Sequence, residues 1–334
     1  MTKLNIRRLI AGGIITNYFC TSCCGHCLYN CSPKWEKRYI GPDTAAKILN
    51  AVKSLGCRSV HVGGGEPLLR PDDLAVVLNI AAELGVSVEY VETNSSWYKD
   101  NLSAEAFLNK LRHQGLHTLL VSISPFHNEH IRFLKVRGVI EAVIEAAGRA
   151  GVGIFPWVID FISDLSQFEA GKTHTLAEFN DLFGRDYLQK VLERYWIHMG
   201  GRALETYRPL MGQKTFHQIM DESTANCYGE LSNTSHFHID LFGNYIPGLC
   251  SGLSIEVEDL GKPLSDETYP VLTTLGRHGI RGLVKMAAEA CGFSPQKDLY
   301  INKCDLCTEV RTFMVQNGYR GSEELKPEEF YLRK

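Results

Sequence analysis

The sequence predicts an α/β fold in which helices cover a parallel sheet. Extended and helical segments alternate over about the first 200 of 334 residues, and Gly or Pro marks each reversal of the chain. Parallel strands need a helical crossover between them, so this alternation favours a parallel sheet. The periodicity alone leaves open whether the sheet closes into a barrel or stays open and doubly wound.

Short β-branched and aromatic runs mark six expected strands. They cover residues 14–19, 59–62, 86–91, 118–123, 152–159 and 195–199. Apolar residues at helical spacing, bounded by Gly or Pro, mark the helices. These cover residues 43–55, 71–84, 104–113, 138–150 and 176–193. Beyond residue 200 Gly, Asn, Ser and His become frequent, so we expect two domains, residues 1–200 and a small α+β cysteine-containing domain of residues 201–334.

The composition limits the class of protein. With 44% hydrophobic and 22% charged residues, the chain falls among ordinary globular proteins, and its net charge of −3 predicts no nucleic-acid partner. It has no run of about 18 apolar residues, so we expect no membrane span. The first ten residues lack the long apolar core of a signal peptide, which predicts a cytoplasmic protein.

The eleven cysteines fall into two groups. Five lie from Cys20 to Cys31 and five from Cys227 to Cys307, with Cys57 between the groups. A chain of this length without an export signal does not need disulfides to build a core. Two separated groups of thiols therefore suggest two metal centres.

Cys20, Cys24 and Cys27 have the spacing C-x3-C-x2-C, directly after the first expected strand. A [4Fe–4S] cluster takes its thiolates from a tight loop, and Gly25 provides backbone freedom for one. Three ligands leave one iron open to bind a small molecule. Cys23 keeps an alternative open, because Cys20/Cys23 and Cys24/Cys27 also form two overlapping C-x2-C pairs that suit zinc. The position of the loop, at the carboxyl end of a strand, favours an active site.

The triplet and the segment after the second expected strand together resemble the radical SAM (S-adenosylmethionine) superfamily. Gly64, Gly65 and Glu66, followed by proline, are similar to the family's GGEP motif. The resemblance implies that these residues hold the methionyl ammonium of SAM. Their types suit this role, since glycines admit a ligand close to the backbone and a carboxylate accepts hydrogen bonds from an ammonium.

Further matches follow along the chain. Asn94 at the end of the third expected strand, and Ser122 and Ser124 on the fourth, occupy positions where the family contacts SAM. Alternation along a strand would point both serines to one face. His26 departs from the pattern, because the family usually has an aromatic residue before the third cysteine, although an imidazole can also lie flat against a ligand. The resemblance covers about residues 5–200 and implies a partial (β/α)6 TIM-like barrel.

For function, the resemblance implies an enzyme with a [4Fe–4S] cluster and SAM as cofactors. Reductive cleavage of SAM yields a 5′-deoxyadenosyl radical, which abstracts hydrogen from a substrate. An external electron donor, such as a flavodoxin or a ferredoxin, is also implied. The substrate expected by analogy is a peptide or protein that is epimerised, crosslinked or oxidised, and the alternative is a small biosynthetic molecule. A hypothesis of another class is a non-enzymatic zinc or electron-transfer iron–sulfur protein.

The C-terminal cysteines suggest a second centre. Cys304 and Cys307 form a C-x2-C pair, and Cys227 and Cys250 lie upstream, where residues 240–250 suggest a hairpin that ends at Cys250. Four thiolates suit a closed zinc site or a [4Fe–4S] cluster. The region, with the Gly-Arg-Ala sequence at 201–203, resembles the Twitch or SPASM-type appendage of radical SAM enzymes. This implies one auxiliary [4Fe–4S] cluster on these four cysteines, with Cys291 as an alternative to Cys227.

No catalytic acid or base is predicted from the sequence. His127, His130, His198 and His238 are isolated in the chain. Each is therefore expected to be a packed or surface residue.

Overall fold

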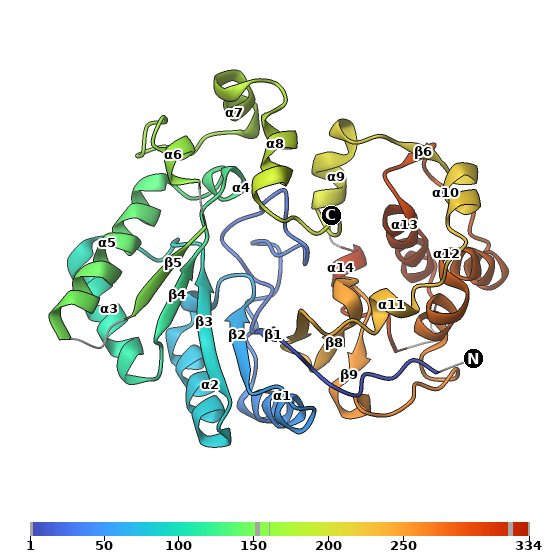
Figure 1. Cartoon of the computed structure of the whole chain (residues 1–334), viewed down its shortest axis with the longest axis horizontal. Helices are drawn as coiled ribbons and strands as arrows, with labels where there is room; N and C mark the ends of the chain where they lie inside the picture. Colours follow the sequence, from blue (N-terminus) through green and yellow to red (C-terminus); the bar gives the residue numbers. More distant parts are fainter. Residues whose placement is uncertain (1–2, 151–153, 160, 320–322, 333–334) are drawn as a thin grey trace.

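The computed structural model describes residues 3–150, 154–159, 161–319 and 323–332. Its main feature is an eight-stranded sheet with the order β5-β4-β3-β2-β1-β7-β8-β9 (Figure 1). The first six of these strands run parallel, and β8 and β9 continue the sheet in antiparallel pairing. The predicted α/β class, a mostly parallel sheet with helices around it, is confirmed.

The parallel strands come from both halves of the chain. They are β1 (Gly12–Ile15), β2 (Ser59–Gly63), β3 (Ser87–Thr93), β4 (Thr118–Val121), β5 (Phe155–Val158) and β7 (Phe237–Asp240). The helices that connect the first five strands lie along the outer side of the sheet (Figure 1). They are α1 (Pro42–Ser54), α2 (Pro71–Leu84), α3 (Asn101–His113) and α5 (Phe133–Ala150). The predicted strand over residues 152–159 lies partly outside the described residues.

Local sequence signals set the helix boundaries. α2 starts at Pro71, and after Leu84 it is capped by Gly85, which has a left-handed φ of +65° that glycine adopts without strain. Asp100 caps α3 by accepting a hydrogen bond from the backbone amide of Ser103. The helix predicted over residues 71–84 is thereby confirmed at both ends.

The sixth predicted strand, over residues 195–199, is wrong, because these residues pair with no strand. Their aromatic and β-branched run suggests a strand, but Tyr195, Trp196 and His198 line a cavity instead. The sixth parallel strand is β7, which pairs with β1 over all four residues of each strand. The sheet therefore has six parallel strands among the described residues, but the sixth comes from the C-terminal half.

The helix predicted over residues 176–193 is in fact two helices, α7 (Leu176–Phe183) and α8 (Tyr187–Arg194). Gly184 separates them with a φ of +105°. The apolar periodicity continues across this glycine, which is why the sequence suggests one helix. Thr175 and Glu178 form a capping box at the start of α7.

In the C-terminal half, β7 and β8 (Asn244–Ile246) form the predicted hairpin, with Gly243 in its turn at a φ of +88°. Cys250 is not on β8 but follows the short 3-10 helix η3 (Pro247–Leu249). β9 (Ile255–Glu256) precedes two long helices that pack together, α12 (Pro270–Cys291) and α13 (Lys303–Gln316). The other elements are the helices α4 (Pro125–Asn128), α6 (Ile162–Leu165), α9 (Ala203–Tyr207), α10 (Phe216–Glu222), α11 (Tyr228–Leu231) and α14 (Glu329–Leu332), the 3-10 helices η1 (Pro67–Leu69), η2 (Arg208–Leu210) and η4 (Val257–Asp259), and the paired strands β6 (Lys214–Thr215) and β10 (Leu299–Tyr300).

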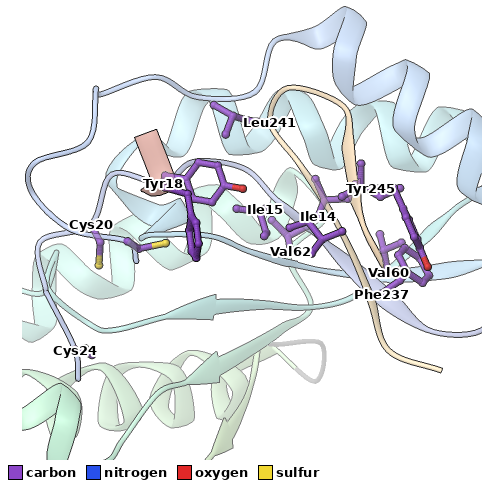
Figure 2. Close-up of a cluster of buried hydrophobic side chains, with 14 of the residues drawn as sticks. Ile14, Ile15, Tyr18, Cys20, Cys24, Val60, Val62, Phe237, Leu241 and Tyr245 are labelled. Atoms are coloured by element: carbon purple, nitrogen blue, oxygen red, sulfur yellow. The ribbon is translucent and has the colours of Figure 1, made fainter. Parts of the chain in front are cut away.

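Buried side chains join the two halves of the sheet, as Figure 2 shows. Ile14 of β1 packs in one core with Phe237 of β7, and both are almost fully buried. Tyr18 stacks on Trp35 with ring centroids 4.5 Å apart, and its hydroxyl donates to Asp240 at 2.9 Å. This packing fixes the segment that leads from β1 into the cysteine loop.

The sheet contains strands from both sides of residue 200, since β7 pairs with β1. The division into domains at that residue stays a prediction. No helix in the described part of the chain has the length and apolar character needed to cross a bilayer.

Candidate active site

A large cavity opens where β1 to β4 end. It has a volume of about 1780 Å³, including its mouth. Eight of the residues predicted from the sequence line it: Cys20, Cys24, Cys27, Gly64, Gly65, Glu66, Asn94 and Ser122. The carboxyl ends of parallel strands are where α/β barrels place their active sites.

The cysteine triplet lies in the loop after β1. Cys20 and Cys24 are each 7% exposed, Cys27 is partly buried, and all three are free thiols. Cys23 is exposed and does not line the cavity. The structure thus brings Cys20, Cys24 and Cys27 to one place and leaves Cys23 outside, while their role as ligands stays a prediction.

Burial and hydrogen bonding set the acidity of these thiols. Burial raises the pKa of Cys20 to about 12 and raises the pKa of Cys24 well above its ordinary value. A hydrogen bond from the Cys31 thiol is the main cause that lowers the pKa of Cys27 to about 6. A [4Fe–4S] cluster fits this donor set, because its iron binds thiolates and supplies the positive charge that compensates buried sulfur anions.

Arg202 holds the cysteine loop by its backbone carbonyls. Its guanidinium donates to the carbonyl oxygens of Cys24 at 2.9 Å and Cys31 at 2.6 Å, and its backbone amide donates to that of Cys27 at 3.1 Å. Thr206 adds a hydrogen bond to the carbonyl of Gly25 at 2.8 Å. The start of the C-terminal half therefore fixes the loop at four carbonyls.

The two glycines of the GGEP segment pack against the segment that leads into Cys20. A Cβ at Gly65 would overlap the carbonyl oxygen of Phe19. Gly64 has a φ of +150°, and a Cβ there would press on Asn17. The amide of Gly65 donates to the Asn17 carbonyl at 2.7 Å. The glycines thus allow two loops to approach closely, a role beyond the ligand contact that the motif suggests.

The carboxylate of Glu66 is fully buried and accepts three hydrogen bonds from the chain itself. The donors are the Leu68 amide at 3.2 Å, the Thr93 hydroxyl at 2.9 Å and the Asn94 amide at 2.6 Å. Burial raises the pKa of Glu66 to about 7, although these hydrogen bonds oppose the rise. Glu66 therefore ties the GGEP segment to the end of β3, and its contact with a SAM ammonium stays a prediction.

The remaining predicted SAM contacts fall into different places. The side-chain amide of Asn94 donates to the Cys20 sulfur at 3.4 Å and so links β3 to the cysteine loop.

Ser122 lines the cavity, but Ser124 does not. The predicted strand over residues 118–123 is too long, because β4 ends at Val121, so the serines do not alternate on it. Ser124 caps α4 instead, with its hydroxyl 2.7 Å from Nδ1 of His127.

His26 lines the cavity from the cysteine loop. Its ring lies 4.7 Å from that of Phe126 and 4.9 Å from that of His127, measured between centroids. Its Nδ1 is buried and has no hydrogen-bond partner among the described residues. Buried polar atoms usually have a partner, so this nitrogen fits a cavity that takes a polar ligand such as SAM.

A second cavity, of about 590 Å³, lies in the C-terminal half. The four C-terminal cysteines predicted as ligands all line it: Cys227, Cys250, Cys304 and Cys307. Cys291 does not line it. Burial raises the pKa of Cys227 to about 12 and that of Cys304 to about 11. His198 lines both cavities, so the two sites are neighbours.

Two cationic side chains accompany these four cysteines. Lys303 and Arg311 line the cavity, and the Lys303 ammonium lies 3.9 Å from the Cys227 sulfur. Positive side chains favour thiolates over thiols. The donor set therefore fits a thiolate-bound centre, either an iron–sulfur cluster or zinc.

Comparison with known families agrees with this geometry. Residues 14–162 match the family model of the radical SAM superfamily. This span runs from β1 through the triplet and the GGEP segment to β5. The chain contains a radical SAM domain. Its radical SAM region therefore contains every site residue that the sequence predicts before the C-terminal half.

Two curated proteins are similar to this radical SAM chain. A probable GTP 3′,8-cyclase of Archaeoglobus fulgidus is 27% identical over 155 residues, which are 46% of this chain and 49% of the relative. The GTP 3′,8-cyclase of Psychromonas ingrahamii is 24% identical over 260 residues, which are 67% of this chain and 74% of the relative. The chain thus spans about half the length of the first of these relatives.

Solved structures are also similar to the chain, at low identity. The structure of native anSMEcpe with bound AdoMet has a TM-score of 0.42 and 13% identity, and the match covers 92% of this chain and 97% of that chain. The structure of BtrN in complex with AdoMet and 2-DOIA has a TM-score of 0.40 and 15% identity, and the match covers 80% of this chain and 82% of that chain.

Several residues of the larger cavity were not predicted from the sequence. The Gly-Arg-Ala sequence indicates the family but not that Arg202 holds the cysteine loop. Cys31 follows the triplet closely, yet its hydrogen bond with Cys27 depends on how the loop folds. His236 and His238 line the cavity together, and only the pairing of β7 with β1 brings them there.

Proposed function

We propose that this protein uses a [4Fe–4S] cluster on Cys20, Cys24 and Cys27 to cleave SAM reductively, and that the 5′-deoxyadenosyl radical removes a hydrogen atom from a substrate. The observation that carries the proposal is the single cavity that the triplet shares with the GGEP segment and Asn94. The bound cluster and SAM would supply the radical chemistry, for which protein side chains have no equivalent.

The chain's own residues would position these groups and exclude water. Arg202 and Asn94 hold the cysteine loop through its carbonyls and the Cys20 sulfur. Tyr195 lines the cavity with a partly buried aromatic ring, which favours exclusion of water around a reactive species. An external flavodoxin or ferredoxin would deliver the electron.

We assign Cys227, Cys250, Cys304 and Cys307 to one auxiliary [4Fe–4S] cluster, with zinc as the alternative. Their common cavity and the nearby cations support this assignment. If it is correct, Cys307→Ala should lower the iron content of the reconstituted protein by about half, since one of two four-iron clusters is lost. Cys291→Ala is the matched control and should leave iron unchanged. Zinc on sulfur ligands, with no iron lost in Cys307→Ala, would favour the alternative.

We propose a peptide or protein segment as the substrate. The four-cysteine cavity supports this class, because appendages of this kind most often accompany peptide modification in the superfamily. The alternative is a small molecule, and it is favoured by the relatives that are named GTP 3′,8-cyclases. Incubation of the reduced enzyme and SAM with GTP, with product analysis by mass spectrometry, tests that alternative directly.

The radical activity can be tested without the substrate. After anaerobic reconstitution, the protein with dithionite and SAM should release 5′-deoxyadenosine. Cys24→Ala should abolish this release, because a three-thiolate site loses one ligand. Cys23→Ala changes an exposed thiol one residue away and should retain it. A colourless zinc protein that never cleaves SAM would overturn the proposal.

A further inference from the structure

Three histidines that no part of the proposed radical chemistry uses lie close together, and two of them, His236 and His238, line the cavity. His61 is on β2, His238 is on β7, and His236 directly precedes β7. Their ring nitrogens offer three ligand atoms that all lie within 4.8 Å of one another. The two Nε2 atoms of His61 and His238 are 3.0 Å apart.

The sheet itself creates this arrangement. β1 lies between β2 and β7, and Gly13 of β1 is in register with His61 on one side and with His238 on the other. Residues in register on adjacent parallel strands point to the same face of the sheet. A Cβ at Gly13 would overlap the imidazole of His61. Glycine at this position therefore leaves the space in which two imidazoles from non-adjacent strands meet.

The surroundings orient these rings. The hydroxyl of Tyr29 lies 2.7 Å from Nδ1 of His238, which leaves the Nε2 of that ring free to face His61. The ring of Tyr90 stacks on His61 at 5.1 Å between centroids. A Glu92 carboxylate oxygen lies 4.0 Å from the Nε2 of His61. A partner on the second ring nitrogen is the usual way in which proteins fix a metal-binding histidine.

The spacing suits one metal ion. Nitrogen ligands at about 2.0–2.1 Å from zinc in a tetrahedral site lie roughly 3.3 Å from each other. The separation of 3.0 Å between His61 and His238 is close to this value. His236 lies within 4.8 Å of both, so a small rotation of its side chain would complete the set.

We propose that His61, His236 and His238 bind a zinc ion. Three imidazoles are a ligand set of catalytic zinc, which keeps its fourth position open. His236, His238 and Glu92 line the same cavity as the cysteine triplet, so that position faces the cavity. A substrate with a carboxylate, phosphate or hydroxyl oxygen could bind there, and this part of the inference rests on the proposed function. The metal site itself is independent of it.

The test is zinc binding by the reconstituted protein. After treatment with a chelator and loading with Zn²⁺, the wild type should hold a zinc ion whose X-ray absorption shows nitrogen and oxygen ligands rather than sulfur. His61→Gln and His238→Gln should each weaken its binding by at least about tenfold, as expected when a ligand is lost. His113→Gln changes an exposed histidine on α3 and should bind zinc like the wild type.

Tyr29→Phe provides a milder variant that keeps all three imidazoles. It removes the hydroxyl beside His238 and should weaken zinc binding by about tenfold, in the range found for outer partners of metal ligands. If the wild type binds no more nitrogen-ligated zinc than His61→Gln, the three rings are a packed, hydrogen-bonded cluster and the inference is wrong. Release of 5′-deoxyadenosine, measured on the same samples without substrate, reports separately on the proposed function.

Discussion

At the scale of single residues, Arg202 connects the C-terminal half of the chain to the cysteine loop. It reaches the cysteine loop from a position more than 170 residues away in the chain, and it binds main-chain carbonyls rather than side chains. Carbonyls are present at every residue, so no local sequence pattern identifies them as its partners. The role of Arg202 in holding the loop can therefore be recognised only in the folded structure.

Replacement of Arg202 tests this role. Arg202→Gln should lower the retention of iron in the reconstituted protein and cost about 2–4 kcal/mol of stability, since two charge-assisted hydrogen bonds are lost. Arg281→Gln is a matched control, because the Arg281 guanidinium also donates to two carbonyls, those of Met220 and Asp221. It should lose stability but keep iron. Equal iron in both variants would contradict a specific role for Arg202.

His127 makes stability depend on pH. Burial lowers its pKa to about 4 from the ordinary value of 6.5. Between these two values the unfolded chain binds a proton at His127 and the folded chain does not, so the free energy of unfolding falls as the pH is lowered. This contribution is complete above pH 6.5 and is lost as the pH falls towards 4.

His127→Gln cannot titrate, so its stability should fall less steeply in this range. The expected difference between wild type and variant is about 1–3 kcal/mol across the window. Denaturant unfolding of the cluster-free protein at several pH values measures it. The same pH dependence in both proteins would show that His127 is not the group responsible.

At the scale of elements, the loops at the strand ends depend on one another. The GGEP segment after β2 packs on the cysteine loop after β1, and Glu66 ties it to the end of β3. Neither contact follows from the motif, which indicates only a close approach by a ligand. A change in one loop should therefore disturb its neighbour.

Gly65→Ala tests this coupling. The new methyl group would overlap the Phe19 carbonyl, so we expect the cysteine loop to shift, with a loss of about 1–3 kcal/mol and lower iron retention. Gly212→Ala serves as the control, because a Cβ there meets nothing within 4 Å. Iron content and denaturant unfolding measure both effects. Normal iron in Gly65→Ala would show that the loop has room to adapt.

Elements were predictable from sequence where local signals decide them. α2 has Pro at its start and Gly at its end, and its predicted range agrees with the structure. Residues 195–199 have the aromatic and β-branched composition of a strand, but a strand also needs a pairing partner, and none is present among the described residues. A short stretch of sequence does not show which distant strand it pairs with. The sequence therefore could not predict that β7, and not residues 195–199, is the sixth parallel strand.

At the scale of the whole molecule, the two halves share one sheet. β7 from the C-terminal half covers the edge of β1, and Arg202 and Thr206 hold the loop that follows β1. The site proposed for the radical cluster therefore has its ligands in one half and part of its support in the other. His198, which lines both cavities, lies at their junction.

Truncation after residue 200 tests whether the first half folds alone. The shortened chain would expose the edge of β1 and the core residues that pack on Phe237. We expect it to aggregate or to unfold without a cooperative transition, as followed by circular dichroism during heating. A cooperative transition with iron retention like that of the full chain would instead support an independent domain of residues 1–200.

The sequence by itself determined the fold class, the family and the residues of the two cysteine groups. These depend on local spacing, such as C-x3-C-x2-C and the GGEP segment, and on the alternation of helical and extended runs. The tertiary structure alone decided which residues meet: β7 beside β1, Arg202 on the cysteine loop, and the three histidines His61, His236 and His238. The physical reason is that strand pairing and main-chain hydrogen bonds act between distant segments and leave little trace in local composition.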